Sequence, residues 1–503
     1  MRTLILGLDG ADWHVMEPLL SAGQLPTLQR LMDRGSHGVL TSTIPPFSAP
    51  AWASMMTGVN PGKHGIYGFT ATDENYGETR IPITSRLRAT PLWRLLNEQS
   101  ISTGIVNLPI LYPAEPLNGC MVGGLSAPGD AKVFTYPDSL SQEIGNPGQN
   151  WCIGRPLIEA NSYGEFVVEA RLKTKRQADF ALRLLAEFDP SLFMVVFDAT
   201  DRLQHYLWRH WDTAHPGHDV QASAAVKSAI PDCYVDLDAH IARIIQAFGD
   251  ANVFVVSDHG FGPASRGLYV EQWLSDRGYL CLKPATANAL DSRDDVDWSK
   301  TRVFLTGAAL RVNLKGRERQ GVVSDGGEYA RLVAELQQEM TQIIDPANRC
   351  AVVRRLYHRD EIYRGAGVAD APDLTPVCEP GYVCVPGFPG PVCGPASNGA
   401  IGFSGDHRAE GILIACGPDI RESRDPVQAS IVDVMPTLLH LYHLAIPEHL
   451  DGRVMTPVIG MGGEKDDPAT DGDAAEWVSP PAESYTEEEI AIVEDQLWAL
   501  GYM

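Results

Sequence analysis

Long hydrophobic runs are missing from this chain of 503 residues. No apolar stretch approaches the roughly 20 residues that a helix needs to cross a bilayer. The first residues lead straight into a buried-strand pattern at 4–8, with no cleavable leader before it. We therefore expect neither a membrane span nor a signal peptide, and we expect a cytoplasmic protein.

Positive charge is also scarce. The chain has 40 Lys and Arg residues against 64 Asp and Glu, which gives a net charge of −24. Proteins that bind nucleic acids usually carry basic patches, so this balance argues against bulk nucleic acid as a partner. It does not exclude a small phosphate ester held by metal ions as a partner.

Cysteine is sparse and shows no pairing motif. There are nine cysteines, an odd number, and none belongs to a Cys-x-x-Cys motif. This usage is typical of free thiols in a reducing compartment. Cys378, Cys384 and Cys393 lie in a segment rich in Pro and Gly. A structural metal site or a disulfide is conceivable there, but three ordinary thiols are the simpler interpretation.

Buried strands alternate with helices along most of the chain. Each expected strand is a short apolar run, which suits a strand covered on both faces. Such alternation predicts an α/β fold with a mostly parallel sheet sandwiched between helices. The expected strands are 4–8, 101–108, 191–198, 252–257 and 411–416, and the expected helices are 26–34, 163–188, 231–248, 328–341 and, interrupted at Pro436, 430–441.

The pattern divides the chain into four parts. We expect residues 1–262 to form the first part of a catalytic core and residues 401–460 its second part. Residues 263–400 have a less regular pattern and should form an inserted cap over the ligand edge of the sheet. Residues 461–503 should be an acidic linker followed by an amphipathic helix.

One serine stands where a helix is expected to begin. Ser48 precedes a short apolar helix that should start near Ala51, with Pro50 as its starting residue. The N–H groups and positive dipole end of that helix suit a phosphate or a developing oxyanion. An N-cap role is the commoner reason for a serine there. As a nucleophile, the hydroxyl would need a base or a metal ion to activate it.

Six residues of metal-ligand type meet that need, because each is expected at a strand end or in the turn after it. Asp201 and His205 are spaced i, i+4 and would point the same way on a helix. Any one of the six has an ordinary explanation as a cap or turn residue, but six at one sheet edge favour a site. Mixed oxygen and nitrogen ligands favour two Zn²⁺ or Mn²⁺ ions over Ca²⁺ or Mg²⁺. The six residues are Asp9, Asp201, His205, Asp258, His259 and His407.

The order and spacing of these motifs resemble the alkaline phosphatase superfamily, and within it the type I phosphodiesterase/nucleotide pyrophosphatase family. The resemblance runs from residue 4 to about residue 458, and it implies an alkaline-phosphatase-like sheet between helices, with an inserted cap. The motifs that carry it are Gly7-Leu8-Asp9-Gly10, Ser48-Ala49-Pro50-Ala51-Trp52, Thr57-Gly58 with Pro61-Gly62-Lys63-His64-Gly65, the stretch 201–205, Ser257-Asp258-His259-Gly260 and Gly405-Asp406-His407.

The resemblance implies metal-dependent hydrolysis of phosphoric esters, of the phosphodiesterase or nucleotide pyrophosphatase type. Ser48 would be the nucleophile, and its attack would give a phosphoseryl intermediate that water then hydrolyses. The family pattern also implies two metal sites. One ion would be held by Asp201, His205 and His407, and the other by Asp9, Asp258, His259 and the Ser48 oxygen.

The chain departs from the family at one position near the nucleophile. The nucleotide pyrophosphatases usually carry Thr as nucleophile and Asn three positions later, where this chain has Ser48 and Ala51. Serine keeps the chemistry, whereas Ala51 removes a side-chain donor that the family uses on a phosphate oxygen. Lys63 and Asn107 are candidates for a replacement donor, although each has a structural explanation.

Other functions are compatible with parts of the pattern. A phosphomonoesterase of the same superfamily would share these ligands, and a catalytically inactive binding protein could use the same fold. The 48–52 motif also resembles the start of a sulfatase maturation motif, but Trp52 replaces the arginine that this motif requires. Trp208 and Trp211 could line the pocket entrance, although core packing on an amphipathic helix explains them better.

Overall fold

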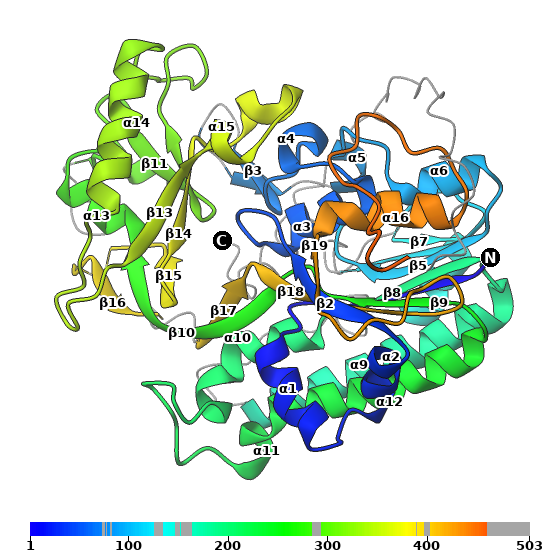
Figure 1. Cartoon of the computed structure of the whole chain (residues 1–503). Coiled ribbons are helices and arrows are strands. Elements are labelled where there is room, and N and C mark those ends of the chain that lie inside the picture. The colour runs from blue at the N-terminus through cyan, green and yellow to red at the C-terminus, as the bar shows by residue number, and fades with distance from the viewer. Residues whose placement is uncertain are drawn as a thin grey trace.

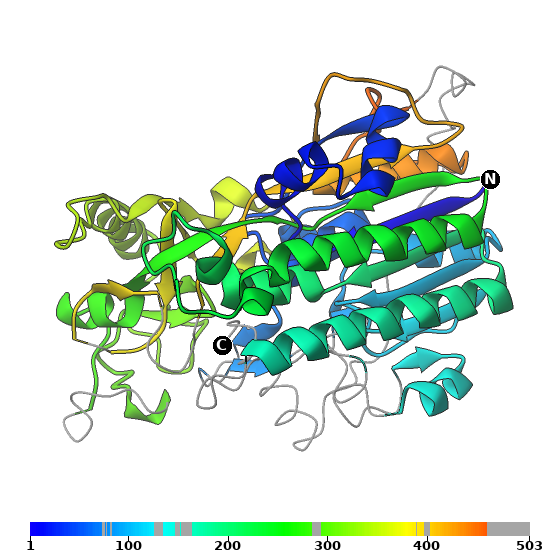
Figure 2. The same ribbon diagram turned by 90° about the horizontal axis from the view of Figure 1, so that it is seen from below.

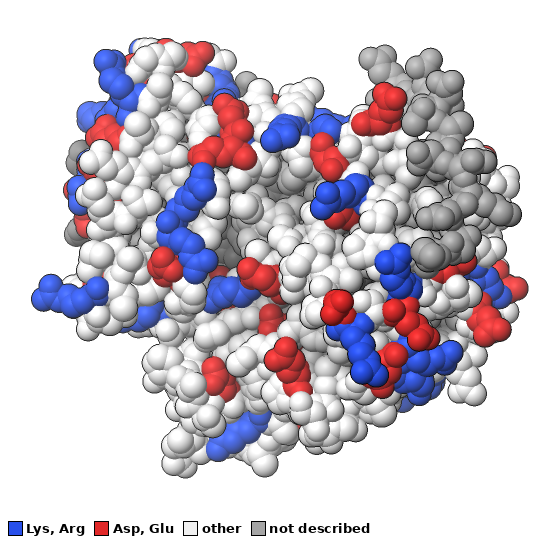
Figure 3. Space-filling model, in the orientation of Figure 1, with Lys and Arg blue, Asp and Glu red and all other residues white. Residues whose placement is uncertain are grey.

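A computed structural model of the chain describes residues 1–72, 76, 78–80, 83–124, 134–145, 151, 163–283, 293–388, 390–396 and 403–459. The predicted acidic linker and terminal helix at 461–503 lie outside these residues. Within the described ranges, none of the helices combines the length and the apolar character that crossing a membrane requires. On the face drawn in Figure 3, acidic and basic side chains are interspersed.

A nine-stranded, mostly parallel sheet forms the core (Figure 1). β1 (Thr3–Leu8) pairs in parallel with β8 (Leu192–Phe197) on one side and with β9 (Asn252–Val256) on the other. Of the nine strands, β18 and β7 run against the rest. The predicted α/β class is confirmed. The order is β19 (Val427–Ser430), β2 (Gly35–Thr41), β18 (Glu410–Cys416), β9, β1, β8, β5 (Thr103–Leu108), β6 (Gly119–Gly123) and β7 (Thr135–Tyr136).

Side-chain alternation along β1 distributes the core between two layers of helices. Leu4 and Leu6 pack into one hydrophobic cluster and Ile5 into the other, because successive side chains of a strand point to opposite faces. In Figure 2 the two longest helices, α9 and α12, run side by side along one face. That layer contains α1 (Trp13–Ser21), α2 (Pro26–Asp33), α9 (Tyr163–Phe188), α10 (Ala199–Trp211) and α12 (Ala229–Phe248), and the opposite layer contains α3 (Ser48–Thr57), α6 (Leu92–Glu98) and α16 (Val434–Leu441).

A long strand, β10 (Gly260–Tyr269), leads from the core into a second body of structure, at the left of Figure 1. β10 pairs with β15 (Gly381–Val385), β16 (Cys393–Pro395) and β17 (Gly405–Arg408). The predicted boundary between core and cap, after residue 262, falls inside β10, which begins at Gly260. The division into core and cap stays a prediction. Beside β10 lies a four-stranded sheet, here called the cap sheet, of order β11 (Val303–Thr306), β12 (Ala309–Val312), β14 (Leu374–Cys378) and β13 (Val353–His358), with α13 (Val270–Asp276) and α14 (Gly327–Met340).

Two expectations about prolines and helix starts are corrected. Pro436 does not interrupt a helix, because it lies in the first turn of α16, where its missing N–H breaks no helical hydrogen bond. α3 begins at Ser48 rather than near Ala51, with Pro50 in its first turn. The shorter elements are α4 (Pro61–His64), β3 (Thr70–Thr72), β4 (Glu78–Arg80), α5 (Ile83–Arg86), α7 (Ser141–Ile144), α11 (Ala224–Lys227) and α15 (Arg359–Ile362), with 3-10 turns at Asp138–Leu140, Arg293–Asp295, Ala366–Asp370 and Ile431–Asp433.

A glycine in β1 allows α3 to approach the sheet closely. A Cβ at Gly7 would lie 2.8 Å from Trp52 Cη2 and 2.8 Å from Val196 Cγ2, well inside van der Waals contact. The bare backbone at Gly7 therefore leaves room for the Trp52 indole. Trp52 Nε1 in turn donates a hydrogen bond to Asp9 Oδ2 at 3.1 Å.

We predict that Gly7→Ala destabilises the protein by about 1–3 kcal/mol, because an added methyl group overpacks a filled core. Urea unfolding measures this change in free energy. Gly164→Ala is the control, since nothing lies within 4 Å of a Cβ added there at the start of α9. An equal loss of stability in both variants would contradict the role assigned to Gly7.

Candidate active site

The predicted ligands converge at the carboxyl end of the central strands. Asp9 directly follows β1, and Asp201 lies in the first turn of α10, which follows β8. His205 lies one helical turn after Asp201. Asp258 and His259 form the junction between β9 and β10. All five side chains are buried. Their convergence is expected, because the carboxyl ends of parallel strands share one edge of the sheet.

His407 reaches the same place by a route that was not expected. It does not follow a strand of the core sheet but lies within β17, where it is opposite Phe261 of β10. Its Nε2 is 3.2 Å from Asp201 Oδ1 and 3.0 Å from His205 Nε2. The expectation of a strand-end position is therefore wrong for His407, although its side chain lies with the others.

Ser48 faces this cluster from the first position of α3. Its hydroxyl donates to Asp9 Oδ1 at 3.2 Å and lies 3.2 Å from His259 Nε2. The side chain is only 2% exposed. Since Trp52 donates to the other Asp9 oxygen, both oxygens of this carboxylate are held by groups from one helix.

Backbone carbonyls orient two of the imidazoles. His205 Nδ1 lies 3.1 Å from Gly405 O, and His259 Nδ1 lies 3.0 Å from Gly260 O. A carbonyl oxygen can only accept a hydrogen bond, so each Nδ1 carries the proton. Each Nε2 then presents its lone pair to the cluster, which is the arrangement found in histidines that bind metal ions.

The donor set fits divalent cations. Buried carboxylates repel one another, and in the described part of the chain the contacts of these three carboxylates within 4.0 Å of a basic side chain are all with histidines, which carry a charge only when protonated. Such a cluster requires compensating positive charge. Asp406, which is partly exposed, was not among the predicted ligands. Potential ligand atoms lie within 4.8 Å of one another in three groups, namely Asp9, Asp258 and His259; Asp201, His259 and His407; and His205, Asp406 and His407.

Comparison with known proteins identifies the family of the chain. The sequence model of the type I phosphodiesterase / nucleotide pyrophosphatase family matches residues 3–393. The chain belongs to this family. It is therefore a phosphoric ester hydrolase of the phosphodiesterase type. No curated protein matches the sequence.

Solved structures show the same fold at low sequence identity. Phosphonoacetate hydrolase from Sinorhizobium meliloti 1021, in complex with phosphonoformate, is 17% identical with a TM-score of 0.53, over 86% of this chain and 94% of that one. Murine ectonucleotide pyrophosphatase / phosphodiesterase 5, as an inactive variant with AMP, is 17% identical with a TM-score of 0.52, over 90% and 97%. The alkaline-phosphatase-like architecture is thus confirmed.

The side chains suggested as replacements for the missing Ala51 donor are both engaged elsewhere in this hydrolase. Asn107 Nδ2 donates to the backbone oxygen of Val196 at 2.8 Å. Lys63 Nζ donates to Asp451 Oδ1 at 2.6 Å. Each has the structural role that was its simpler explanation.

The two tryptophans of α10 do not line the mouth of the cleft described below. Trp208 is fully buried and stacks on Phe261, with ring centroids 5.9 Å apart. Trp211 packs edge to face against Trp208 at 5.3 Å. Core packing on an amphipathic helix, the preferred interpretation of these residues, is confirmed.

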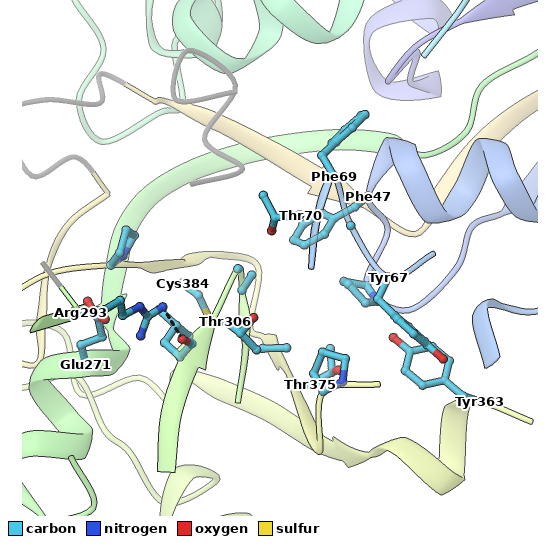
Figure 4. Close-up of a pocket in the computed structure, with 18 residues that line it drawn as sticks. Phe47, Tyr67, Phe69, Thr70, Glu271, Arg293, Thr306, Tyr363, Thr375 and Cys384 are labelled. Atoms are coloured by element: carbon cyan, nitrogen blue, oxygen red, sulfur yellow. Dashed lines mark hydrogen bonds between the residues drawn. The ribbon is translucent and has the colours of Figure 1, made fainter. Parts of the chain in front are cut away.

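A cleft opens at Phe47, the residue before Ser48, between the core and the cap sheet (Figure 4). Its volume is about 960 Å³ with the open mouth included. The core contributes Phe47 and Tyr67, Tyr363 lies beside Tyr67, and the cap side contributes Thr306 and Cys384. The Phe47 ring also packs edge to face against a ligand candidate, His407, at 5.8 Å, so one side chain touches both the cleft and the buried cluster.

Burial and the repulsion between carboxylates raise the pKa values of Asp9 and Asp258. Burial, together with the charges of Asp258 and Asp201, raises the pKa of Asp9 well above its usual value. Burial raises the pKa of Asp258 to about 7. Burial also lowers the pKa of His407 to about 4, so this imidazole is neutral at physiological pH. Cations would therefore compete with protons for Asp9 and Asp258.

We predict that the metal-free protein loses stability as the pH rises through about 7. The ordinary pKa of Asp258 is 3.8 and its folded-state pKa is about 7, so the folded protein binds this proton more tightly than the unfolded chain does. The resulting stabilisation is complete below pH 3.8 and is lost as the pH rises through about 7. Added Zn²⁺ or Mn²⁺ should therefore raise the melting temperature more at pH 8 than at pH 5.5, roughly one unit to either side of that pKa.

Thermal unfolding at both pH values, with and without each ion, measures this effect. In Asp258→Asn, the titrating group is replaced by a neutral side chain of the same shape, and the metal-free protein should lose much of its pH dependence in this range. Equal metal-induced shifts at the two pH values would contradict the prediction.

Proposed function

We propose that this hydrolase cleaves phosphodiesters in two steps, through a phosphoseryl intermediate on Ser48, with two divalent metal ions, Zn²⁺ or Mn²⁺. The observation that carries the proposal is the position of the Ser48 hydroxyl, 3.2 Å from both Asp9 Oδ1 and His259 Nε2. A serine becomes a nucleophile when a neighbouring group takes up its proton or withdraws its charge. Asp9 and His259 could take up the proton, and as metal ligands they would hold an ion that withdraws charge from the Ser48 oxygen.

The ligand atoms suit two ions, with His259 and His407 near the border between them. When bound, such ions stabilise negative charge on the attacking and leaving oxygens of a phosphoryl transfer. One ion would be held by Asp201, His205 and His407, and the other by Asp9, Asp258, His259 and the Ser48 oxygen.

The chain's own groups also contribute to the reaction. Asp9 accepts the hydroxyl hydrogen bond of Ser48 and so orients the nucleophile. The first turn of a helix offers N–H groups to an anion, and in α3 those of Ser48 and Ala49 lie next to the nucleophile, whereas Pro50 has none. We infer that these backbone donors take over the role of the side-chain donor that is missing at Ala51.

The cleft at Phe47 is proposed to bind the organic part of the ester. Tyr67 and Tyr363 pack edge to face at 5.2 Å, and their hydroxyls donate to backbone oxygens of residues 367 and 44. Their rings therefore remain as contact surface for a planar or apolar group. Arg293 and Glu271 lie at the opposite end of the cleft (Figure 4), which favours a substrate with a polar distal end.

Hydrolysis of three p-nitrophenyl esters tests the reaction class. A phosphodiester, a phosphate monoester and a sulfate ester are compared in metal-replete protein, in chelator-treated protein and after Zn²⁺ or Mn²⁺ is added back. Faster metal-dependent cleavage of the diester supports the proposal. Faster cleavage of the monoester would instead assign the protein to the phosphomonoesterases of the superfamily, and activity on none of the three would favour a binding protein on this fold.

Ser48→Ala should lower kcat by a factor on the order of a thousand or more, as the loss of a catalytic nucleophile does, while the fold and metal content are retained. The control is Ser54→Ala, in the same helix, where the hydroxyl contacts His64 at 2.9 Å outside the ligand cluster. Steady-state kinetics and metal analysis of both variants give the answer. Substantial turnover in Ser48→Ala would exclude Ser48 as nucleophile.

His407→Ala should reduce the metal content from two ions to one, because it removes a ligand from only one of the proposed sites. Elemental analysis after dialysis against metal-free buffer measures the stoichiometry. His440→Ala, on the last turn of α16 and remote from the cluster, should keep both ions. An unchanged metal content in His407→Ala would refute its role as a ligand.

A further inference from the structure

Two cysteines face each other, and one of them belongs to the wall of the cleft. Cys378 ends β14 and Cys384 lies within β15, and their Sγ atoms are 3.7 Å apart. Both side chains are half-buried free thiols. Cys384 lines the cleft, as Figure 4 shows, whereas Cys378 is not one of the lining residues. Of the cysteines that the structure describes, these are the two whose sulfurs touch.

The pair connects two different sheets. Cys378 is opposite Val353 in the cap sheet, whereas Cys384 is opposite Leu268 of β10. The two positions are only six apart in sequence, so the contact forms where the chain turns from one sheet to the other. A covalent bond here would join the cap sheet to β15, which pairs with the strand that begins next to His259.

We propose that Cys378 and Cys384 form a reversible disulfide and are thus a redox modification site in the wall of the catalytic cleft. Disulfides of intracellular proteins are usually transient and redox-sensing. A reduced pair in sulfur contact, with one member facing an open cleft, has the geometry for such a role.

The step requires an external oxidant, and a low-molecular-weight disulfide such as glutathione disulfide supplies it. Cys384 is reached from the cleft, loses its proton to solvent and attacks one sulfur of the oxidant, which releases the first glutathione thiol. Cys378 then loses its proton and attacks Cys384 Sγ, which releases the second. Two protein thiols are oxidised to one disulfide, and one glutathione disulfide is reduced to two thiols.

The surroundings of the two sulfurs explain why Cys384 attacks first and Cys378 second. The hydrogen bond with Cys384, together with burial, raises the pKa of the Cys378 thiol well above its usual value. A thiol with a raised pKa is a poor first nucleophile. It can still act second, because the mixed disulfide would be held next to it.

Oxidation should change the shape of the cleft. Closing the bond brings the sulfurs from 3.7 Å to about 2.0 Å, which draws Cys384 away from the cleft and towards β14. β15 carries Cys384 and pairs with β10, so the strain reaches the strand next to His259. This consequence rests on the proposed function, because it assumes that the substrate's organic group occupies the cleft.

Peptide mapping by mass spectrometry tests the proposal on the full chain, without any assay of activity. After incubation with glutathione disulfide, we expect a peptide linkage between Cys378 and Cys384 with the loss of two hydrogen atoms, and its reversal by dithiothreitol. The buried thiols Cys120 and Cys233 should remain unmodified. Linkage to another cysteine, or a glutathione adduct that persists on Cys384 of the wild type, would overturn the proposal.

Two variants separate the pair from the other thiols. Cys378→Ala, which leaves the cleft lining intact, should keep its activity when reduced but should accumulate a glutathione adduct on Cys384. Cys350→Ala removes an exposed thiol and should form the 378–384 disulfide as the wild type does. Absence of an adduct in Cys378→Ala would refute Cys384 as the attacking thiol.

The activity of the oxidised wild type tests the effect on the cleft. We expect kcat/KM for bis(p-nitrophenyl) phosphate to fall by about tenfold or more and to recover on reduction, since small displacements near a reaction centre have effects of this size. A complete disulfide with unchanged kcat/KM would overturn the link to the cleft. Because the mapping result does not depend on turnover, it stands whether or not the diester proves to be a substrate.

Discussion

The burial of three carboxylates at one edge of the sheet is the constraint on which the site depends. Asp9, Asp201 and Asp258 are each no more than 3% exposed, and burying like charges together is strongly unfavourable unless they are compensated. The compensation is unequal. Burial alone would raise the pKa of Asp201, but His205 and His407 hold it well below its usual value, whereas the pKa values of Asp9 and Asp258 are raised. Asp9 and Asp258, the carboxylates beside Ser48, are therefore the ones whose negative charge is least compensated. A serine nucleophile requires positive charge at this same position.

Close packing between α3 and β1 fixes Ser48, the proposed nucleophile, relative to these carboxylates. Trp52 can hydrogen-bond to Asp9 only because Gly7 has no side chain between the helix and the strand. Ser48 lies one turn earlier on the same helix and contacts the other oxygen of Asp9. The distance between nucleophile and ligand is thus set by core packing rather than by a mobile loop, which is the arrangement that favours a preorganised reaction centre.

The sequence was most informative where local pattern and function coincide. Asp9 and Asp258 follow continuous apolar runs, so their positions at the ligand edge could be predicted from β1 and β9 alone. His407 could not be placed in this way, because β17 has only four residues and its position depends on pairing with β10. β10 was itself missed, since Pro263 and several glycines interrupt its pattern.

The contact between Cys378 and Cys384 was unpredictable for a related reason. Sequence showed three cysteines in a segment rich in Pro and Gly, and ordinary thiols were the simpler interpretation. Their contact depends on how the end of the cap sheet meets β15, which is a property of tertiary packing.

β2 was missed because its burial alternates after Gly35 and Ser36, so it lacks the continuous apolar run of the central strands.

β10 links the candidate metal site to the cap. It begins beside His259, pairs with β17 at the level of His407 and pairs further along with β15, which carries Cys384 into the cleft wall. A change in the position of β15 would therefore reach two of the proposed metal ligands through its hydrogen bonds to β10. The cap is in this respect more than a lid with independent specificity, because the strand that leads into it also positions the groups that would hold the ions.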